Sequence, residues 1–182
     1  ASDVYKRQGY ALVGVAAGNA AGAKGVLIYM AIYLFMNIGT FAVILSMRKE
    51  GRYVENISDL AGLNKSHPMM ALAMLIFMFS MAGIPPLAGF FSKWYVFLAA
   101  IDAGLYGLAV IGVLASVVGA FYYIRIIKVM YFDDSDQALD SGMSADMRVI
   151  MGATAVVTLL FFIIPAPVVD LAGLAAETLF IK

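Results

Sequence analysis

The chain has 182 residues, of which 63% are hydrophobic and 13% charged, and twelve Lys and Arg balance twelve Asp and Glu. A soluble domain is closer to about half apolar and about a quarter charged, so this composition predicts an integral membrane protein. The neutral balance gives no signal for nucleic-acid binding. The chain lacks Cys and has one histidine, His67, which excludes disulfides, thiolate metal sites and multi-histidine metal sites.

The beginning of the chain is charged, and the apolar stretch after it runs only from Tyr10 to Gly18. Nine residues cannot cross a hydrocarbon core of about 30 Å, and the pattern is not that of a signal peptide. We therefore expect a partial helix over about 9–18, in the C-terminal part of a longer protein. We expect residues 1–8 to be a non-native or disordered start.

Four longer apolar segments follow and predict an all-α, polytopic bundle of transmembrane helices. These segments are 25–47, 68–101, 105–132 and 147–164. Loops at 19–24, 48–67, 102–104 and 133–146 join them, and no strands are expected there. Proline ends the last segment, and the weakly amphipathic tail after it is expected on the membrane surface.

The segment 68–101 is too long for one straight crossing. Its 34 residues would form a helix of about 51 Å. A hairpin would have arms of about 16 residues, which is below the usual length of a membrane-spanning helix. We predict one discontinuous helix, interrupted near 83–86 at Gly83, Pro85 and Pro86, because the two prolines lack the backbone N–H that a helix needs.

The distribution of basic residues independently favours a single broken crossing. With one crossing, loops 48–67 and 133–146 lie on the same side, and with a hairpin they do not. Seven basic residues then lie on that side and two, Lys24 and Lys182, on the other. The seven are Arg48, Lys49, Arg52, Lys65, Arg125, Lys128 and Arg148. By the positive-inside rule, these two loops are predicted to be cytoplasmic and the C-terminus periplasmic.

Lys93 is the only charged residue between His67 and Asp102. A lysine near the centre of a membrane helix costs about 2.5–3.5 kcal/mol, and such residues usually face a protein interior or a water-filled path. Burial disfavours the ammonium form, so Lys93 beside a wetted helix break is predicted to accept and release a proton. In the alternative interpretation, its ammonium extends to the membrane interface and anchors the helix.

Other polar residues are candidates to support Lys93. Tyr33, Asn37 and Thr40 share one face of the helix 25–47. Ser92 neighbours the lysine, and Ser116 and Tyr122 lie on the next helix. These side chains could hold water near Lys93, or they could simply form hydrogen bonds between helices.

The string SMAGIPPLAGFFSKWYVF (Ser80–Phe97) resembles the broken-helix motif of the antiporter-like membrane subunits of respiratory complex I. The strings FYYIRIIKVMYF and IYMAIYLFMNIGTFAVI resemble the N branch of this family, whose mitochondrial counterpart is NADH dehydrogenase subunit 2. A lysine at position 93 fits the N and L branches. The helix 25–47 lacks the His and Lys of the L and M branches, which favours N.

The resemblance implies a fold of two inverted repeats, each with a discontinuous helix, of which this chain holds most of the second repeat and the terminal helix. It also implies that Lys93 is the proton-channel lysine of a translocase subunit in the bacterial plasma membrane. NADH, FMN, iron–sulfur clusters and quinone are expected in other subunits, and no cofactor or metal in this chain. The implied partners are other membrane-arm subunits, lipid and protons. A cation/proton antiporter subunit and a purely structural membrane subunit are the alternatives.

Overall fold

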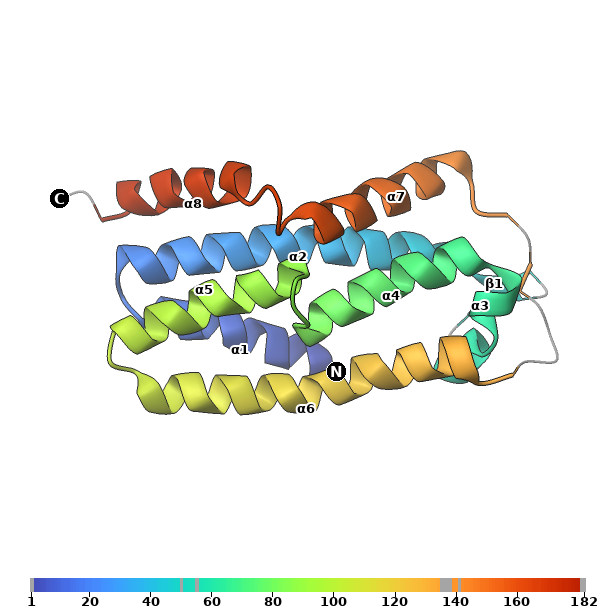
Figure 1. Ribbon diagram of the computed structural model, residues 1–182, viewed down its shortest axis with the longest axis horizontal. Coiled ribbons are helices and arrows are strands. Elements are labelled where there is room, and N and C mark those ends of the chain that lie inside the picture. The colour runs from blue at the N-terminus through green and yellow to red at the C-terminus, as the bar shows by residue number, and fades with distance from the viewer. Residues whose placement is uncertain (1, 50, 55, 135–138, 141, 181–182) are drawn as a thin grey trace.

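The computed structural model describes residues 2–49, 51–54, 56–134, 139–140 and 142–180, with side chains from residue 8 onward. Seven helices run roughly along one long axis (Figure 1). They are α1 (Ser2–Ala16), α2 (Ala20–Ser46), α4 (Pro68–Ala82), α5 (Ala88–Asp102), α6 (Tyr106–Phe132), α7 (Ala145–Leu160) and α8 (Ala166–Thr178). Two of these, α2 and α6, have 27 residues each and are long and apolar enough to cross a membrane.

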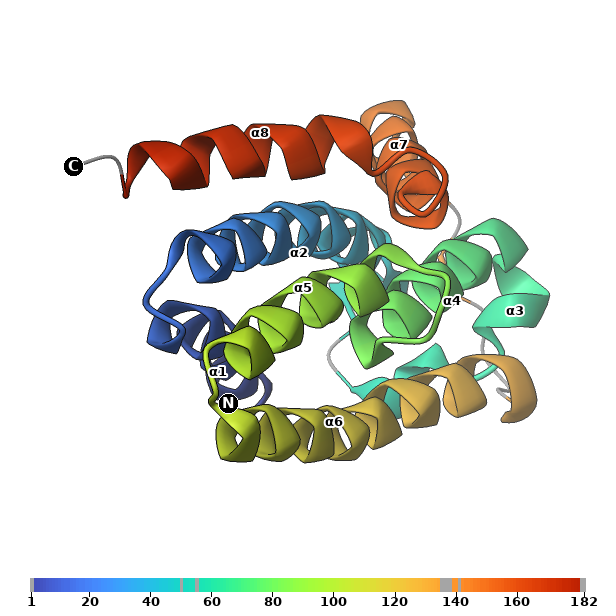
Figure 2. The same ribbon diagram turned by 60° about the vertical axis from the view of Figure 1, so that its left-hand side comes forward.

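Helix α2 is the centre of the bundle. Figures 1 and 2 both place it between the pair α7–α8 and the pair α4–α5, with α6 beyond α4–α5. The main hydrophobic core lies in these layers, and Ile28, Val43 and Phe77 are completely buried in it. This burial accounts for part of the apolar composition of α2 and α4, whereas other apolar side chains, such as Leu34 and Phe41 on α2, are exposed.

Helix α2 begins earlier than its apolar stretch predicts. It starts at Ala20 rather than Gly25 because the Asn19 side chain accepts a 2.8 Å hydrogen bond from the Gly22 amide and so caps the first turn. Helix α1 likewise begins at Ser2, upstream of the expected start near residue 9.

The segment 68–101 forms two helices, and a glycine ends the first of them. Gly83 adopts a left-handed conformation with φ of 88°. Its amide bonds to the Ser80 carbonyl at 2.9 Å, and the Ile84 amide bonds to the Phe79 carbonyl at 3.1 Å. This pair of bonds is the Schellman arrangement, which satisfies carbonyls at a helix end. Helix α5 then starts at Ala88 and continues in the direction of α4 (Figures 1 and 2).

The loop 48–67 contains short elements where only loop is predicted. Strands β1 (Arg48–Lys49) and β2 (Arg52–Tyr53) pair in antiparallel register, with Gly51 at a φ of 76° in the turn between them. A 3-10 turn, η1 (Ile57–Leu60), and a one-turn helix, α3 (Leu63–Ser66), follow. The expectation of no strand here is wrong, because two-residue strands are too short to leave an alternating pattern.

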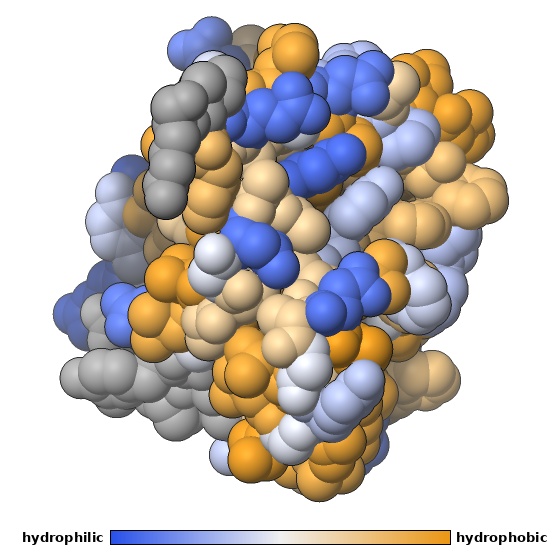
Figure 3. All heavy atoms as spheres, turned by 90° about the vertical axis from the view of Figure 1, so that its left-hand side faces the viewer, coloured by the Kyte–Doolittle hydropathy of each residue, from blue (hydrophilic) through white to orange (hydrophobic). Residues whose placement is uncertain are grey.

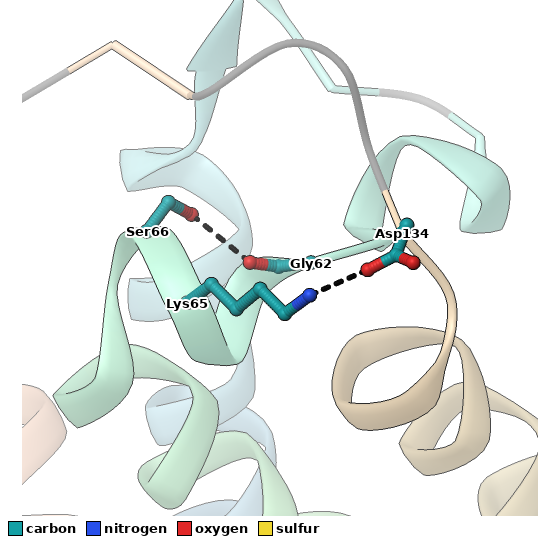
Figure 4. A network of polar contacts seen from close by, with 4 residues as sticks. All are labelled: Gly62, Lys65, Ser66 and Asp134. Carbon is teal, nitrogen blue, oxygen red and sulfur yellow. Dashed lines mark hydrogen bonds and ion pairs between the residues drawn. The ribbon is translucent and has the colours of Figure 1, made fainter.

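Polar contacts bind this loop to the segment after α6. Lys65 on α3 forms an ion pair with Asp134, and the Ser66 hydroxyl donates to the Gly62 carbonyl within the same turn (Figure 4). Asp140 adds a second link, because its side chain accepts a 2.8 Å hydrogen bond from the Gly51 amide. We refer to this end of the bundle, with loops 48–67 and 133–144, as the basic end.

A second interruption separates α7 from α8. Helix α7 ends at Leu160, short of the expected Ile164, and α8 packs along the first half of α2 instead of leaving the bundle (Figure 1). Val168, Val169 and Ala172 of this segment join the main core. The rings of Phe161 and Phe162 lie 6.2 and 5.7 Å from that of Phe91 on α5. The two interruptions are therefore neighbours at mid-height of the bundle.

Candidate functional site

Lys93 reaches back across the interruption between α4 and α5. Its ammonium donates hydrogen bonds to the carbonyls of Met81 and Ala82, at 3.0 and 3.2 Å, and to the hydroxyl of Ser116 on α6, at 2.7 Å. The two carbonyls belong to the last turn of α4, where a helix carries partial negative charge. Three acceptors, two carbonyls and one hydroxyl, therefore surround the partly buried ammonium.

Gly83 serves both the turn and the lysine. Only glycine adopts its left-handed conformation without strain. A Cβ atom at this position would also lie 3.1 Å from the Lys93 ammonium nitrogen. Pro85 and Pro86 follow in the connection and, lacking N–H groups, add no unsatisfied donor to it.

A completely buried serine joins α4 to α5. The Ser80 hydroxyl accepts a 2.9 Å hydrogen bond from the Gly89 amide at the start of α5 and lies 3.0 Å from the Met36 sulfur on α2. The Gly89 backbone approaches Ser80 so closely that a Cβ atom there would overlap the Ser80 carbonyl oxygen. The Ser80 hydroxyl and the absence of a side chain at Gly89 thus fix the offset between α4 and α5.

A small cavity of about 30 Å³ lies beside Lys93. A water molecule needs about 10–15 Å³ of free volume and polar partners, and this cavity provides both. The Lys93 ammonium also lies 5.3 Å from the centre of the Tyr10 ring, within the range of a cation–π contact. The lining residues are Tyr10, Tyr29, Tyr33, Met36, Ser80, Met81, Gly89, Ser92, Lys93, Ser116, Gly119 and Tyr123.

The structure brings several of the predicted support residues to this place. Ser116 bonds to Lys93 directly, and Tyr33 lines the cavity. Ser92 also lines it, but its hydroxyl donates to the Gly89 carbonyl at 2.8 Å. Asn37 and Thr40 line a larger adjoining cavity of about 360 Å³. The Thr40 hydroxyl donates to the Met36 carbonyl at 2.7 Å.

Tyr122 is not at the site. Its side chain is 51% exposed and packs edge-on against Phe121, whereas the neighbouring Tyr123 lines both cavities. Tyr10, Ser80 and Gly89 are site residues that the sequence did not single out. Of these three, Gly89 could have been found from the sequence. It lies four residues before Lys93, near the start of a helix, and a glycine there lets another backbone approach closely.

Within the described part of the chain, no group of three or more His, Cys, Asp or Glu side chains could hold a metal ion. The groups of this site that could exchange a proton are the Lys93 amine and the Ser116 hydroxyl, and the cavity beside them has room for water.

Residues 6–119 match the family described as NADH:quinone oxidoreductase/Mrp antiporter, transmembrane. The chain is 64% identical to the NADH-quinone oxidoreductase subunit N of Rhodospirillum rubrum and 59% identical to that of Paramagnetospirillum magneticum. Each alignment covers 94% of this chain and 35% of the relative. The chain thus spans about a third of the length of these curated relatives.

Solved structures of membrane complexes contain chains with the same fold. A chain of respiratory complex I from Thermus thermophilus with bound aureothin superposes with a TM-score of 0.74 and 28% identity, over 88% of this chain and 36% of that one. A chain of the Mrp complex from Dietzia shares the fold, with a TM-score of 0.81 and 22% identity over 96% of this chain and 41% of that one. These matches confirm the predicted helical, antiporter-like membrane fold, and the chain belongs to the NADH:quinone oxidoreductase/Mrp antiporter transmembrane family.

Proposed function

We propose that this chain is the C-terminal part, about residues 9–182, of a proton-translocating N-type subunit in the membrane arm of NADH:quinone oxidoreductase. The observation that carries the proposal is the Lys93 ammonium, hydrogen-bonded to Met81, Ala82 and Ser116 beside a cavity large enough for water. The 64% identity to a curated N subunit supports the assignment of the branch.

Lys93 is the proton carrier in this proposal. In the ammonium form, its three N–H groups match the three acceptors around it. After release of one proton, the neutral amine has two donors and one lone pair, so the Ser116 hydroxyl can reverse and donate to the nitrogen. The Ser116 hydroxyl can thus accept from the ammonium or donate to the neutral amine, which suits a residue that must be stable both with and without its proton.

Helices α4 and α5 would then be the two halves of one discontinuous crossing in the second of two inverted repeats. Loops 48–67 and 133–146 would face the cytoplasm of a bacterium and the C-terminus the periplasm. Lys93 would receive a proton, hold it, and release it toward the periplasm when a neighbouring charge in the complex changes. Other subunits would carry NADH, FMN, the iron–sulfur clusters and quinone.

The test is proton translocation by the assembled complex with Lys93→Met in the full-length subunit. We expect strongly reduced translocation per NADH oxidised, because methionine cannot carry a proton. Lys93→Arg is the matched variant and should be nearly as impaired, because arginine does not deprotonate. Normal translocation by Lys93→Met would contradict the proposal.

Lys93→Arg also distinguishes a proton-carrying lysine from one that only anchors its helix at the membrane interface, because an anchoring lysine tolerates arginine.

A cation/proton antiporter subunit is the second candidate function, supported by the fold shared with the Mrp complex. It predicts that transport by the reconstituted protein depends on Na⁺ or K⁺ in the absence of NADH.

A further inference from the structure

Helix α1 supplies an aromatic ring to the Lys93 site. The Lys93 ammonium lies over the ring of Tyr10, with 5.3 Å between the nitrogen and the ring centre. The lysine itself belongs to α5, and the acceptors of its hydrogen bonds, on Met81, Ala82 and Ser116, belong to α4 and α6. The ring of Tyr10 therefore adds α1 to the helices that surround this charge.

Tyr10 lies on the face of α1 that is turned into the bundle. Tyr10 and Val13 are 7% and 6% exposed, whereas Leu12 and Val15 are each more than 60% exposed. Residues three apart share a helical face, so the rotation of α1 directs Tyr10 inward. A ring shielded from water attracts a cation more strongly than a ring at the surface does.

Two neighbouring rings fix the orientation of Tyr10. The ring of Phe97 on α5 lies 6.0 Å away at an interplanar angle of 79°, so the two rings meet edge-on. The ring of Tyr29 on α2 lies 6.0 Å away at 56°. Pairs with these geometries are favourable. The rings lie between Lys93 and the end of the bundle in Figure 3, whose surface has hydrophilic residues among hydrophobic ones.

An aromatic face suits a cation that also has to lose a proton. The ring attracts the ammonium through its quadrupole, and its face offers no lone pair to which the proton could pass. A carboxylate at the same place would favour the ammonium through its full negative charge and could itself take the proton. The ring of Tyr10 therefore holds the charge of Lys93 without competing for its proton.

We propose that Tyr10 is a positioning residue, whose ring face holds the Lys93 ammonium against its acceptors on α4 and α6. The inference rests on the proposed function and adds the residue that keeps the charged form of the carrier in place. When the ring is removed, the ammonium loses this attraction on the side of α1 and can move away from Ser116. Helix α1 thus contributes to proton transfer through a group that never carries the proton.

The test weakens the attraction of the ring face and leaves the size of the ring nearly unchanged. In the full-length subunit, position 10 carries phenylalanine, or phenylalanine with one, two or three ring fluorines introduced by stop-codon suppression. Each fluorine draws electrons out of the ring, so its face attracts a cation less. A ring that only fills space is insensitive to this series, whereas a ring that holds a cation loses its effect step by step.

The first measurement is the melting temperature of the purified full-length subunit, both with Lys93 and in the Lys93→Met background. We expect the melting temperature to fall with each fluorine when Lys93 is present and to change little when it is replaced. Such a double-mutant cycle isolates the interaction between the two positions. The same response in both backgrounds would overturn the inference, whether or not Lys93 carries protons.

The second measurement is proton translocation by the assembled complex. Tyr10→Phe should keep most of the wild-type rate, because the ring face remains. The rate should then fall in the order of fluorination, and Tyr10→Leu should be at least several-fold slower than Tyr10→Phe. A flat fluorine series would overturn the inference. So would a loss already complete in Tyr10→Phe, because it would assign the effect to the hydroxyl.

Phe97 is the matched control. Its ring belongs to the same cluster as Tyr10, but among the described residues no cation–π contact joins it to the Lys93 ammonium. The same fluorinated residues at position 97 should leave translocation unchanged and affect the melting temperature equally in both backgrounds. Equal sensitivity of positions 10 and 97 would overturn the inference. A graded melting temperature at position 10 with normal translocation by Lys93→Met would reject the carrier and retain the contact.

Discussion

The most consequential contact at the scale of single residues is the one between Lys93 and Ser116. The bond of 2.7 Å is shorter than the bonds from the ammonium to the Met81 and Ala82 carbonyls, and it joins Lys93 to a side chain on another helix. A hydrogen bond to a charged group contributes about 1.5–3 kcal/mol. In the proposed function, Ser116 would position Lys93 in both of its protonation states.

Replacement of this serine tests that role. Ser116→Ala should slow proton translocation to a rate between those of the wild type and Lys93→Met, because the ammonium loses one acceptor and the neutral amine loses its donor. Ser116→Thr keeps the hydroxyl and should restore most of the rate. Translocation assays on the assembled complex make the comparison, and equal rates for Ser116→Ala and wild type would exclude the role.

At the level of residues, the sequence singles out side chains that are exceptional in their surroundings. Lys93 stands out as a lone charge in an apolar run, and Ser116 as a hydroxyl on the next helix. Tyr122 and Tyr123 could not be told apart, because few residues of α6 are buried and its pattern does not fix the rotation of the helix. The Met81 and Ala82 acceptors are backbone groups and have no sequence signal of their own.

At the scale of elements, the junction of α4 and α5 depends on Gly89. Gly89→Ala should reduce stability by about 1–3 kcal/mol, the usual cost of overpacking, because the new methyl group would overlap the Ser80 carbonyl. Thermal denaturation of the purified full-length protein measures the loss. Gly152→Ala, in α7 with open space around it, should cause no loss. Equal effects of the two changes would contradict the described junction.

The ion pair between α3 and the segment after α6 gives a prediction on pH. The hydrogen bond from Lys65 holds the pKa of the Asp134 carboxyl below its usual range. A lowered native pKa means that the pair stabilises the fold above the ordinary carboxyl pKa of about 4 and loses this effect as the pH falls through the native value. The stability difference between wild type and Lys65→Met should be small, vanish in acid and shrink in high salt. A difference that grows in acid would contradict this.

Sequence patterns placed the long helices well and their ends less well. The apolar run of α2 does not include residues 20–24, which are helical because Asn19 caps the first turn. The tail after Pro167 was expected on the membrane surface because it is only weakly amphipathic. Its apolar side, with Val168, Val169 and Ala172, instead fills the space along α2. Such packing depends on the neighbouring helix and is not encoded in the segment alone.

For the whole molecule, the distribution of charge predicts orientation. Ser58 lies at the basic end and Thr178 at the end of α8, and both are exposed. In native membrane vesicles, Ser58→Cys should be labelled from the cytoplasmic side and Thr178→Cys from the periplasmic side. Impermeant thiol reagents make the measurement. Labelling of both positions from one side would contradict the orientation.

Much of the bundle surface is apolar, as expected for a chain that spans about a third of its relatives. Ile111, Leu114 and Val117 on α6 are each more than 60% exposed. Their contacts could not be predicted from this sequence, because lipid and the surface of another protein favour the same side chains.

The two interruptions at mid-height also determine where the bundle can bend. Helices α2 and α6, with 27 residues each, are continuous rods of about 40 Å. The pairs α4–α5 and α7–α8 are jointed at the same level, where Phe91 meets Phe161 and Phe162. A lateral displacement of one joint would therefore move the other joint as well, while α2 and α6 keep their length. Lys93 on α5 is hydrogen-bonded across one joint to the Met81 and Ala82 carbonyls of α4. Bending at this joint would therefore change the lengths of these hydrogen bonds.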